Sequence, residues 1–263
     1  MNLLDLFKRP KFQVAIIIPL YKSQLTTYEE ISLVQCTKVL GEYPIHIVCP
    51  EDLVFDLSTL PFTRNITVTR FSPRFFESRM GYNRLLLSIE FYRRFLNYKY
   101  ILIYQLDAFV FQDELSYWCS QGFDYIGAPW IRDSSENRPR KRKFTKLSPR
   151  GLWVYLFEKD IPIGNGGFSL RKVKTCLLTL LLGRSKATEW SRNEDLFWSY
   201  YAPTIYPLFS FPAPEIASRF SFETHPREIY EKNQHTLPFG CHGWWKYDVA
   251  FWRQVFRNYG YAI

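Results

Sequence analysis

The sequence predicts an α/β fold with a mostly parallel central sheet and helices on its faces. Three observations support this prediction: apolar runs that fit strands buried on both faces, helical periodicity in the segments between them, and the alternation of the two over the first ~110 residues. The chain has 263 residues, which is enough for one large domain with a substantial core. We therefore expect a single domain over residues 1–263.

Residue type and spacing indicate the first strands and the helix between them. The run VAIIIPLYKS (14–23) is rich in β-branched residues and stops at polar ones, which is typical of a buried parallel strand followed by a binding loop. Residues 26–40 have helical spacing, and Gly41 is the expected helix stop. Two further runs, YPIHIVCP (43–50) and NITVTRF (65–71), predict two more strands.

A helix and a long strand complete the first half. Apolar residues recur every three or four positions from Arg79 to Leu96, which predicts one helix. This helix leads directly into KYILIYQLDAFVF (99–111), which reads as a strand.

The second half is less regular and contains a basic segment, residues 132–151, with eight Lys and Arg and no apolar periodicity. This segment is either a solvated surface insert or a flap over a phosphorylated or lipid-linked substrate.

The overall charge limits the classes of partner. The chain has 34 Lys and Arg against 25 Asp and Glu, a net charge of +9 that favours phosphates, nucleic acid or an acidic membrane surface. Apart from the basic segment, the basic residues are scattered, and no recognised nucleic-acid-binding motif accompanies them. We therefore expect no nucleic acid partner.

The cysteines and the first residues favour a cytoplasmic location. Five cysteines are an odd number without a C-x-x-C pair, so neither a disulfide framework nor a zinc site is indicated. We expect neither a signal peptide nor a membrane span, because no basic start precedes a long apolar run and no ~18 apolar residues occur in succession. The segment MNLLDLFKRPK (1–11) is either a frayed terminal turn or a peripheral contact with the inner face of the membrane.

One carboxylate, Asp107, falls at the end of the predicted strand YILIYQL (100–106). In an open α/β sheet, ligands bind beyond the carboxyl ends of the strands. A carboxylate left unpaired inside a sheet is costly, so it must be paired, metal-bound or at the edge. Asp107 is therefore either a strand-end ion pair or a group that binds a metal ion or a hydroxyl.

Two polar motifs follow in the second half. IPIGNGGFSLRK (161–172) has three glycines in four positions, and it is either a tight turn or a loop that brings backbone close to a ligand. RNEDLFWSYY (192–201) places Glu194 and Asp195 before an aromatic helical run. These acids are either partners of the helix dipole or a base presented to a bound hydroxyl.

Near the C-terminus, His242 stands between two glycines in LPFGCHGWWKYD (237–248). The sequence favours a tight turn here, which can point the imidazole inward. A lone histidine is usually structural, but a neutral imidazole also joins a carboxylate in binding Mn²⁺ or a similar ion. Glu223, in ASRFSFE, is either structural or faces the acceptor.

The order of these pieces resembles that of GT-A-fold glycosyltransferases that use nucleotide sugars. The motifs YQLDAFVF, YIGAPW, IGNGGFSLR, NEDLFW, ASRFSFE and PFGCHGW together resemble a bacterial family of such enzymes over most of the chain, from about Val14 to Trp245. The resemblance implies a GT-A-like fold with a donor-binding half at about 12–130 and an acceptor and catalytic half at about 131–263. It implies transfer of a sugar from a nucleotide-diphosphate sugar to a glycan or lipid-linked glycan in cell-surface polysaccharide synthesis.

The resemblance also implies roles for individual residues. Asp107 matches the last acid of a metal-binding Asp-x-Asp motif and His242 matches the C-terminal ligand of Mn²⁺ or Mg²⁺. Gln105 replaces the first acid, so either the metal site is weaker or Lys and Arg bind the diphosphate instead. Asp195 matches the base of an inverting displacement, and Glu194 orients the acceptor or exchanges roles with it. The implied donor-binding residues are Pro19, Tyr21, Lys22, Asn83, Gln105, Asp107, Gly164, Asn165, Gly166 and Gly167.

A second interpretation is a non-catalytic nucleotide-sugar- or carbohydrate-binding protein with the same fold. Gln105 is its best support, because the loss of an acid weakens metal chemistry.

Overall fold

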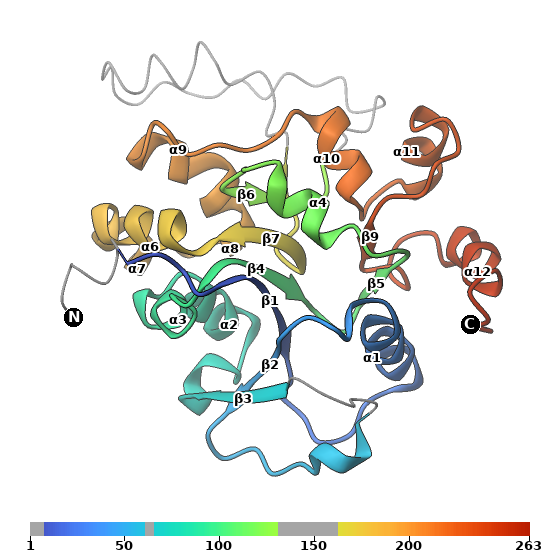
Figure 1. Cartoon of the computed structure of the whole chain (residues 1–263), viewed down its shortest axis with the longest axis horizontal. Helices are drawn as coiled ribbons and strands as arrows, with labels where there is room; N and C mark the ends of the chain where they lie inside the picture. The colour runs from blue at the N-terminus through green and yellow to red at the C-terminus, as the bar shows by residue number, and fades with distance from the viewer. Residues whose placement is uncertain (1–7, 61–65, 131–162) are drawn as a thin grey trace.

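A computed structural model describes residues 8–60, 66–130 and 163–263 (Figure 1). Its centre is a six-stranded sheet in the order β3-β2-β1-β4-β7-β6. The first four of these strands run parallel, and β7 pairs antiparallel with β4 and with β6. The strands are β1 (Phe12–Pro19), β2 (Ile45–Pro50), β3 (Ile66–Phe71), β4 (Tyr98–Tyr104), β6 (Tyr125–Ile126) and β7 (Phe168–Lys172). The predicted mixed α/β fold with a mostly parallel sheet is confirmed.

Helices cover both faces of this sheet (Figure 1). The helices are α1 (Thr27–Leu40), α2 (Arg79–Leu86), α3 (Ile89–Arg94), α4 (Leu115–Ser120), α6 (Val173–Leu182), α7 (Arg184–Thr188), α8 (Glu194–Leu196), α9 (Ala202–Ile205), α10 (Pro214–Phe220), α11 (Pro226–Lys232) and α12 (Val249–Arg257). Short helical turns are η2 (Leu57–Thr59), η3 (Pro73–Phe75) and η4 (Phe197–Tyr201), the last a π-helical turn. Within the described residues, no helix is both long and apolar enough to cross a membrane.

The two faces of the sheet carry two cores, because side chains alternate along a strand. In β1, Ala15 and Ile17 pack into the core that α2, α3 and α6 cover. Val14, Ile16 and Ile18 point the other way, into the core that α1 and α4 cover. All five are almost completely buried, which explains why the run is apolar at every position rather than at every second one.

Helix α1 begins where the sequence indicated. Thr26 is its N-cap and Glu29 completes a capping box, with the Glu29 carboxylate accepting from the Thr26 backbone at 2.8 Å. Gly41 stands at the C-cap, as expected. The N-terminus of α1 therefore directly follows the loop that leaves the carboxyl end of β1.

A second, smaller sheet holds the C-terminal part of the chain against the first. Its order is β5-β9-β8, with β5 (Ala108–Val110) antiparallel and β8 (Ser221–Phe222) parallel to β9 (Gly240–His242). Aromatic residues of α12 pack against it: Phe256 stacks on Phe109 of β5, and Trp252 stacks on Phe111, the residue just after β5. Residues far apart in the chain thus meet at the end of β4.

Two predicted elements are each divided. The predicted strand 99–111 is β4 and β5 in two different sheets, separated by a turn in which Ala108 N donates to Gln105 O at 2.9 Å. The predicted helix 79–96 is α2 and α3, because the Ser88 hydroxyl accepts from Phe91 N at 3.0 Å and begins a new helix. Periodicity continues through both breaks, so the sequence pattern did not reveal them.

Several predictions fall outside the described residues. These are the membrane contact of residues 3–7, the first residue of the predicted strand at 65, the role of the basic segment 132–151 and the start of the glycine-rich segment at 161–162. The five cysteines are free and buried.

Candidate functional site

A cavity of about 770 Å³ lies beyond the carboxyl ends of β1 and β4. Every residue that the sequence assigned to the site lines it except Gly164, which lies against the Trp130 side chain. The loop after β1, the turn after β4, the glycine-rich loop before β7 and the start of α8 all contribute. This is the position at which open α/β sheets bind ligands.

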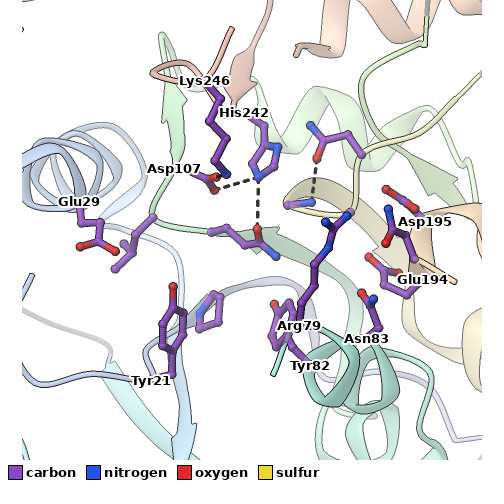
Figure 2. A pocket seen from close by; sticks show the side chains of 18 of the residues that line it. Tyr21, Glu29, Arg79, Tyr82, Asn83, Asp107, Glu194, Asp195, His242 and Lys246 are labelled. Atoms are coloured by element: carbon purple, nitrogen blue, oxygen red, sulfur yellow. Dashed lines mark hydrogen bonds and ion pairs between the residues drawn. The ribbon is translucent and has the colours of Figure 1, made fainter. Parts of the chain in front are cut away.

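The turn after β4 brings Asp107 to His242. Because β5 pairs with β9, Ala108 lies opposite His242, and Asp107 O accepts from Gly243 N at 2.8 Å. The side chains then meet directly, with His242 Nε2 at 2.8 Å from Asp107 Oδ1. Lys246 Nζ donates to the other oxygen, Asp107 Oδ2 (Figure 2). The carboxylate is therefore paired with His242, the last residue of β9, and with Lys246 of the loop that follows.

The imidazole of His242 is held among oxygens. Its Nε2 also lies 3.2 Å from Gln105 Oε1, and its Nδ1 lies 3.2 Å from Glu223 Oε1. Since a neutral imidazole has a single N–H, oxygens on both sides favour the doubly protonated ring. Glu223, which the sequence left open between two roles, lines the cavity and contacts this ring.

Burial and charge act in opposite directions on this pair. Burial would raise the pKa of Asp107, but the charges and hydrogen bonds of His242 and Lys246 hold it well below its usual range. Burial would lower the pKa of His242, but Asp107 and then Glu223 raise it to about 9. Both groups are thus charged at neutral pH.

The residues that the sequence assigned to a metal ion have suitable chemistry. A carboxylate oxygen of Asp107, an imidazole nitrogen of His242 and an amide oxygen of Gln105 converge, and Glu223 contacts the far side of the ring as outer carboxylates do in metal sites. Lys246, however, already contacts Asp107. In the part of the chain that the structure describes, no group of three or more His, Cys, Asp and Glu side chains could hold a metal ion.

The glycine-rich loop is fixed against this turn. Asn165 adopts a left-handed conformation, with φ of 57°, and its Oδ1 accepts from Gly167 N at 2.8 Å. Gly167 O in turn accepts from Gln105 N at 2.8 Å. A Cβ on Gly167 would lie 2.0 Å from His242 Nε2, so only glycine lets the histidine approach.

Beside this loop lies a buried ion pair between Arg171 and Glu194. Arg171 Nη2 is 2.8 Å from Glu194 Oε1, and its guanidinium also donates to Gly166 O at 3.2 Å and to the Tyr92 hydroxyl at 3.2 Å. Arg171 is completely buried. The pair holds Glu194 against the glycine-rich loop, where a Cβ on Gly166 would lie 1.7 Å from Glu194 Oε1.

Asp195 differs from its neighbour. It is half-buried and lines the cavity, and its Oδ1 accepts from Leu196 N at 2.7 Å; among the described residues, no cationic side chain hydrogen-bonds to it. Burial, followed by the negative charge of Glu194, raises the pKa of Asp195 to about 7. A carboxyl group with this pKa can exchange a proton near neutral pH.

The cavity opens past the loop after β1. Tyr21 is 58% exposed at this edge, and Lys22 pairs with Glu29 of α1 at 2.7 Å. Figure 2 shows Asn83, Glu194 and Asp195 grouped together, across the cavity from Asp107 and Lys246. The cavity therefore has one end with the ion-paired Asp107, His242 and Lys246 and another end lined by amide and carboxylate groups.

The sequence did not single out several residues of the site. Lys246 and Arg79 line the cavity as cations, and Arg171 lies behind it. Lys246 stands four residues after His242, a spacing that could have drawn attention to it. Arg171 carries no local signal, since a single basic residue in a strand is common on sheet edges.

Comparison with known proteins finds similar structures. No curated protein matches the sequence. The chain is similar to the apo-form glycosyltransferase GlyE of Streptococcus pneumoniae TIGR4 (11% identity, 88% of this chain and 54% of that chain, TM-score 0.45), so it spans about half of GlyE. It is also similar to the galactosyltransferase LgtC in complex with donor and acceptor sugar analogues (14% identity, 87% of this chain and 86% of that chain, TM-score 0.40). A third similar structure is the mannosyltransferase Ktr4p of S. cerevisiae in complex with GDP (11% identity, 82% of this chain and 70% of that chain, TM-score 0.44).

The sequence also matches one protein-family model. The match covers residues 65–242, which include the strand β4, the glycine-rich loop and both adjacent acids. The chain belongs to the family DUF5672, which is described as a protein of unknown function.

Proposed function

We propose that this protein is an inverting GT-A-type glycosyltransferase. It moves a sugar from a nucleotide-diphosphate sugar to a hydroxyl of a glycan or lipid-linked glycan in cell-surface polysaccharide synthesis, at the cytoplasmic face of the membrane. The observation that carries the proposal is one cavity that combines the basic side chains of Lys246 and Arg79 with a half-buried carboxyl group of raised pKa. Both are placed beyond the carboxyl ends of parallel strands, where such folds bind nucleotides.

The basic side chains of the cavity suit a leaving diphosphate. When the bond between the anomeric carbon and the phosphate oxygen breaks, its electron pair stays on the phosphate, and positive groups must stabilise this charge. Lys246 and His242 are balanced by Asp107 and Glu223, whereas Arg79 adds a further positive charge to the lining. We assign Lys246 and Arg79 to the diphosphate.

The opposite end suits the acceptor. The acceptor oxygen forms the new bond to the anomeric carbon, and its proton passes to Asp195. A base is most effective when its pKa lies near the working pH, and Asp195 meets this condition with a pKa of about 7. Glu194 is held by Arg171, so we assign the proton transfer to Asp195 alone.

The nucleoside belongs at the open edge in this proposal. Tyr21 offers an exposed ring on which a base can stack, and Pro19 at the end of β1 and Lys22 in the loop after it also line the cavity.

A divalent ion such as Mn²⁺ or Mg²⁺ would be held by Asp107 and His242 with Gln105 once Nε2 of His242 has lost its proton and Lys246 has left the carboxylate. Bound there, it would supply Lewis-acid stabilisation of the departing phosphate.

A non-catalytic nucleotide-sugar- or carbohydrate-binding protein is the second candidate. The contact between Lys246 and Asp107 favours it, because it occupies the carboxylate that metal chemistry requires.

The test is a thermal-shift panel of nucleotide sugars with and without Mn²⁺, followed by transfer assays with the donor that binds. A donor raises the melting temperature because it binds only the folded state. Binding with turnover supports the transferase. Binding without turnover on any glycan or lipid-linked acceptor would favour the second candidate, and no shift with any nucleotide sugar would contradict both.

A further inference from the structure

We propose that a second cavity, beside α8, binds a distal sugar residue of the acceptor glycan. This distal subsite rests on the proposed function and deepens it, because it makes the acceptor an oligosaccharide rather than a single sugar. The residue that reacts at Asp195 is then anchored through a neighbouring sugar that does not react.

The second cavity has a volume of about 440 Å³, within the range of about 300–1,000 Å³ that is common for small-molecule sites. It is lined by the segment 189–192, which follows α7, and by Leu196, Tyr200 and Tyr201. None of these residues lines the cavity of about 770 Å³, so the two cavities are separate.

A single short segment separates the two cavities. Residues 193–195 line the larger one, whereas Arg192 and Leu196, on either side of them, line the second one. Ser191 and Arg192 are exposed, so the loop before α8 leads from one cavity to the other along the surface. Because these residues are consecutive, a short oligosaccharide with its reacting hydroxyl at Asp195 is long enough to reach the second cavity.

The indole ring of Trp190 is held in place in the second cavity. Its Nε1 donates to Asn193 O at 2.9 Å, which ties the ring to the wall of the larger cavity. The ring also contacts those of Phe197 and Tyr201, with centroids 5.5 and 5.6 Å away. Trp190 is partly exposed. An aromatic ring that is already fixed offers a surface for the apolar face of a sugar at little further cost in side-chain entropy.

The charged side chains of this cavity suit sugar hydroxyls. The Arg192 guanidinium is a donor and the Glu189 carboxylate is an acceptor, and both residues are exposed. Within the part of the chain that the structure describes, neither side chain has a hydrogen-bond or ion-pair partner. A hydroxyl both donates and accepts, so it can bind to either group. One positive and one negative group give the lining no net charge, which favours a neutral sugar over a phosphate.

A π-helical turn forms one side of the cavity. In η4, which directly follows α8, Ala202 N donates to Phe197 O in the i→i+5 pattern of a π-helix. Tyr200 and Tyr201 of this turn line the cavity. Such turns are rare and frequently stand at functional sites. The turn is therefore a second observation, independent of the cavity itself, that points to a ligand on this side of α8.

An anchored distal sugar would affect the rate as well as the binding. Binding energy from a part of the substrate that does not react can place the reacting group. A sugar held by Trp190 and Arg192 limits where the acceptor hydroxyl lies relative to Asp195. We therefore expect transfer to an oligosaccharide with a kcat/KM about tenfold or more above that for the matching monosaccharide.

The experiment uses matched pairs of neutral glycans. The probes are tetrasaccharides of glucose, galactose, mannose or N-acetylglucosamine, each paired with the methyl glycoside of its monosaccharide. The variants are Trp190→Leu and Arg192→Met, and the control is Arg257→Met, which changes an exposed arginine of α12 that lines neither cavity. Calorimetry measures the binding of each glycan, and transfer assays measure kcat/KM.

We expect the parent protein and the control to bind at least one tetrasaccharide about tenfold or more tightly than its methyl glycoside. Both variants should lose this preference and still bind UDP and GDP within about twofold of the parent protein. Trp190 packs against other rings, so its loss can lower stability, whereas Arg192→Met should leave the melting temperature unchanged because Arg192 is exposed.

A preference for the tetrasaccharide that persists in both variants would overturn the distal subsite, as would the absence of any preference in the parent protein. Transfer to a methyl glycoside with the same kcat/KM as to its tetrasaccharide would keep the proposed function and remove the subsite. Tetrasaccharide binding that depends on Trp190 and Arg192, without transfer from any nucleotide sugar, would instead keep the glycan site and show that the transferase function is wrong.

Discussion

Nε2 of His242 lies 2.8 Å from Oδ1 of Asp107, so the two residues assigned to a metal ion contact each other directly. Lys246 takes the second oxygen of the same carboxylate. Asp107 therefore carries a protein cation on each oxygen before any ligand binds. A divalent ion has to compete with Lys246 for this carboxylate, whereas a diphosphate can use the same lysine directly.

The first prediction concerns this competition. Lys246→Met should strengthen Mn²⁺ binding, on the order of tenfold, because it removes a positive charge beside Asp107. It should weaken nucleoside diphosphate binding in metal-free buffer. Calorimetry with MnCl₂ measures the first effect, and Lys99→Met, an exposed lysine at the far end of β4, is the matched control. Mn²⁺ affinity that is unchanged in Asp107→Ala would show that the metal assignment is wrong.

The second prediction concerns the pH dependence of Asp195. If Asp195 is the base, kcat/KM rises with pH through about 7, because only the ionised carboxylate accepts a proton. Asp195→Asn should retain donor binding and lose transfer. Equal turnover in this variant would remove Asp195 from the mechanism.

The same carboxyl group should affect stability in the opposite direction. Its pKa is raised from 3.8 to about 7 on folding, so the folded state keeps a proton that the unfolded chain releases. The resulting stabilisation is fully present below the unfolded pKa and is lost as the pH rises through about 7. Urea unfolding at several pH values should show this loss in the parent protein and in Asp52→Asn, an exposed control, but not in Asp195→Asn.

The third prediction concerns the buried pair of Arg171 and Glu194. Arg171→Met should lower the free energy of unfolding by about 3–5 kcal/mol, because it leaves the Glu194 charge buried without a partner. The double variant Arg171→Met, Glu194→Gln should regain part of this loss, since no charge then remains.

The control for this prediction is an exposed pair. Lys232→Met, which breaks an exposed pair with Glu228, should change stability by no more than about 0.5 kcal/mol. Chemical denaturation of the four proteins separates the two cases. A double variant as unstable as Arg171→Met would mean that packing of the arginine, rather than its charge, is what matters.

Much of the fold and the residues of the site could be predicted from the sequence, because both follow from local patterns. Buried parallel strands need continuous apolar runs, and polar residues at their carboxyl ends mark the ligand side of the sheet. Asp107 was found in this way, whereas Asp195 was found from its place before an aromatic helical run and from the family resemblance; both line the cavity. Continuous periodicity misled the prediction where a turn at Gln105 or a cap at Ser88 divides an element without interrupting the pattern.

The sequence by itself determined the strands, the helices and the kinds of side chain at the strand ends, since these depend on neighbours in the chain. Only the tertiary structure decided which of them meet. Lys246 reaches Asp107 from 139 residues away because β9 pairs with β5, and Arg171 of β7 meets Glu194 of α8 across 23 residues of chain. Such contacts depend on how the sheets pack, and no local pattern encodes the partner of a buried charge.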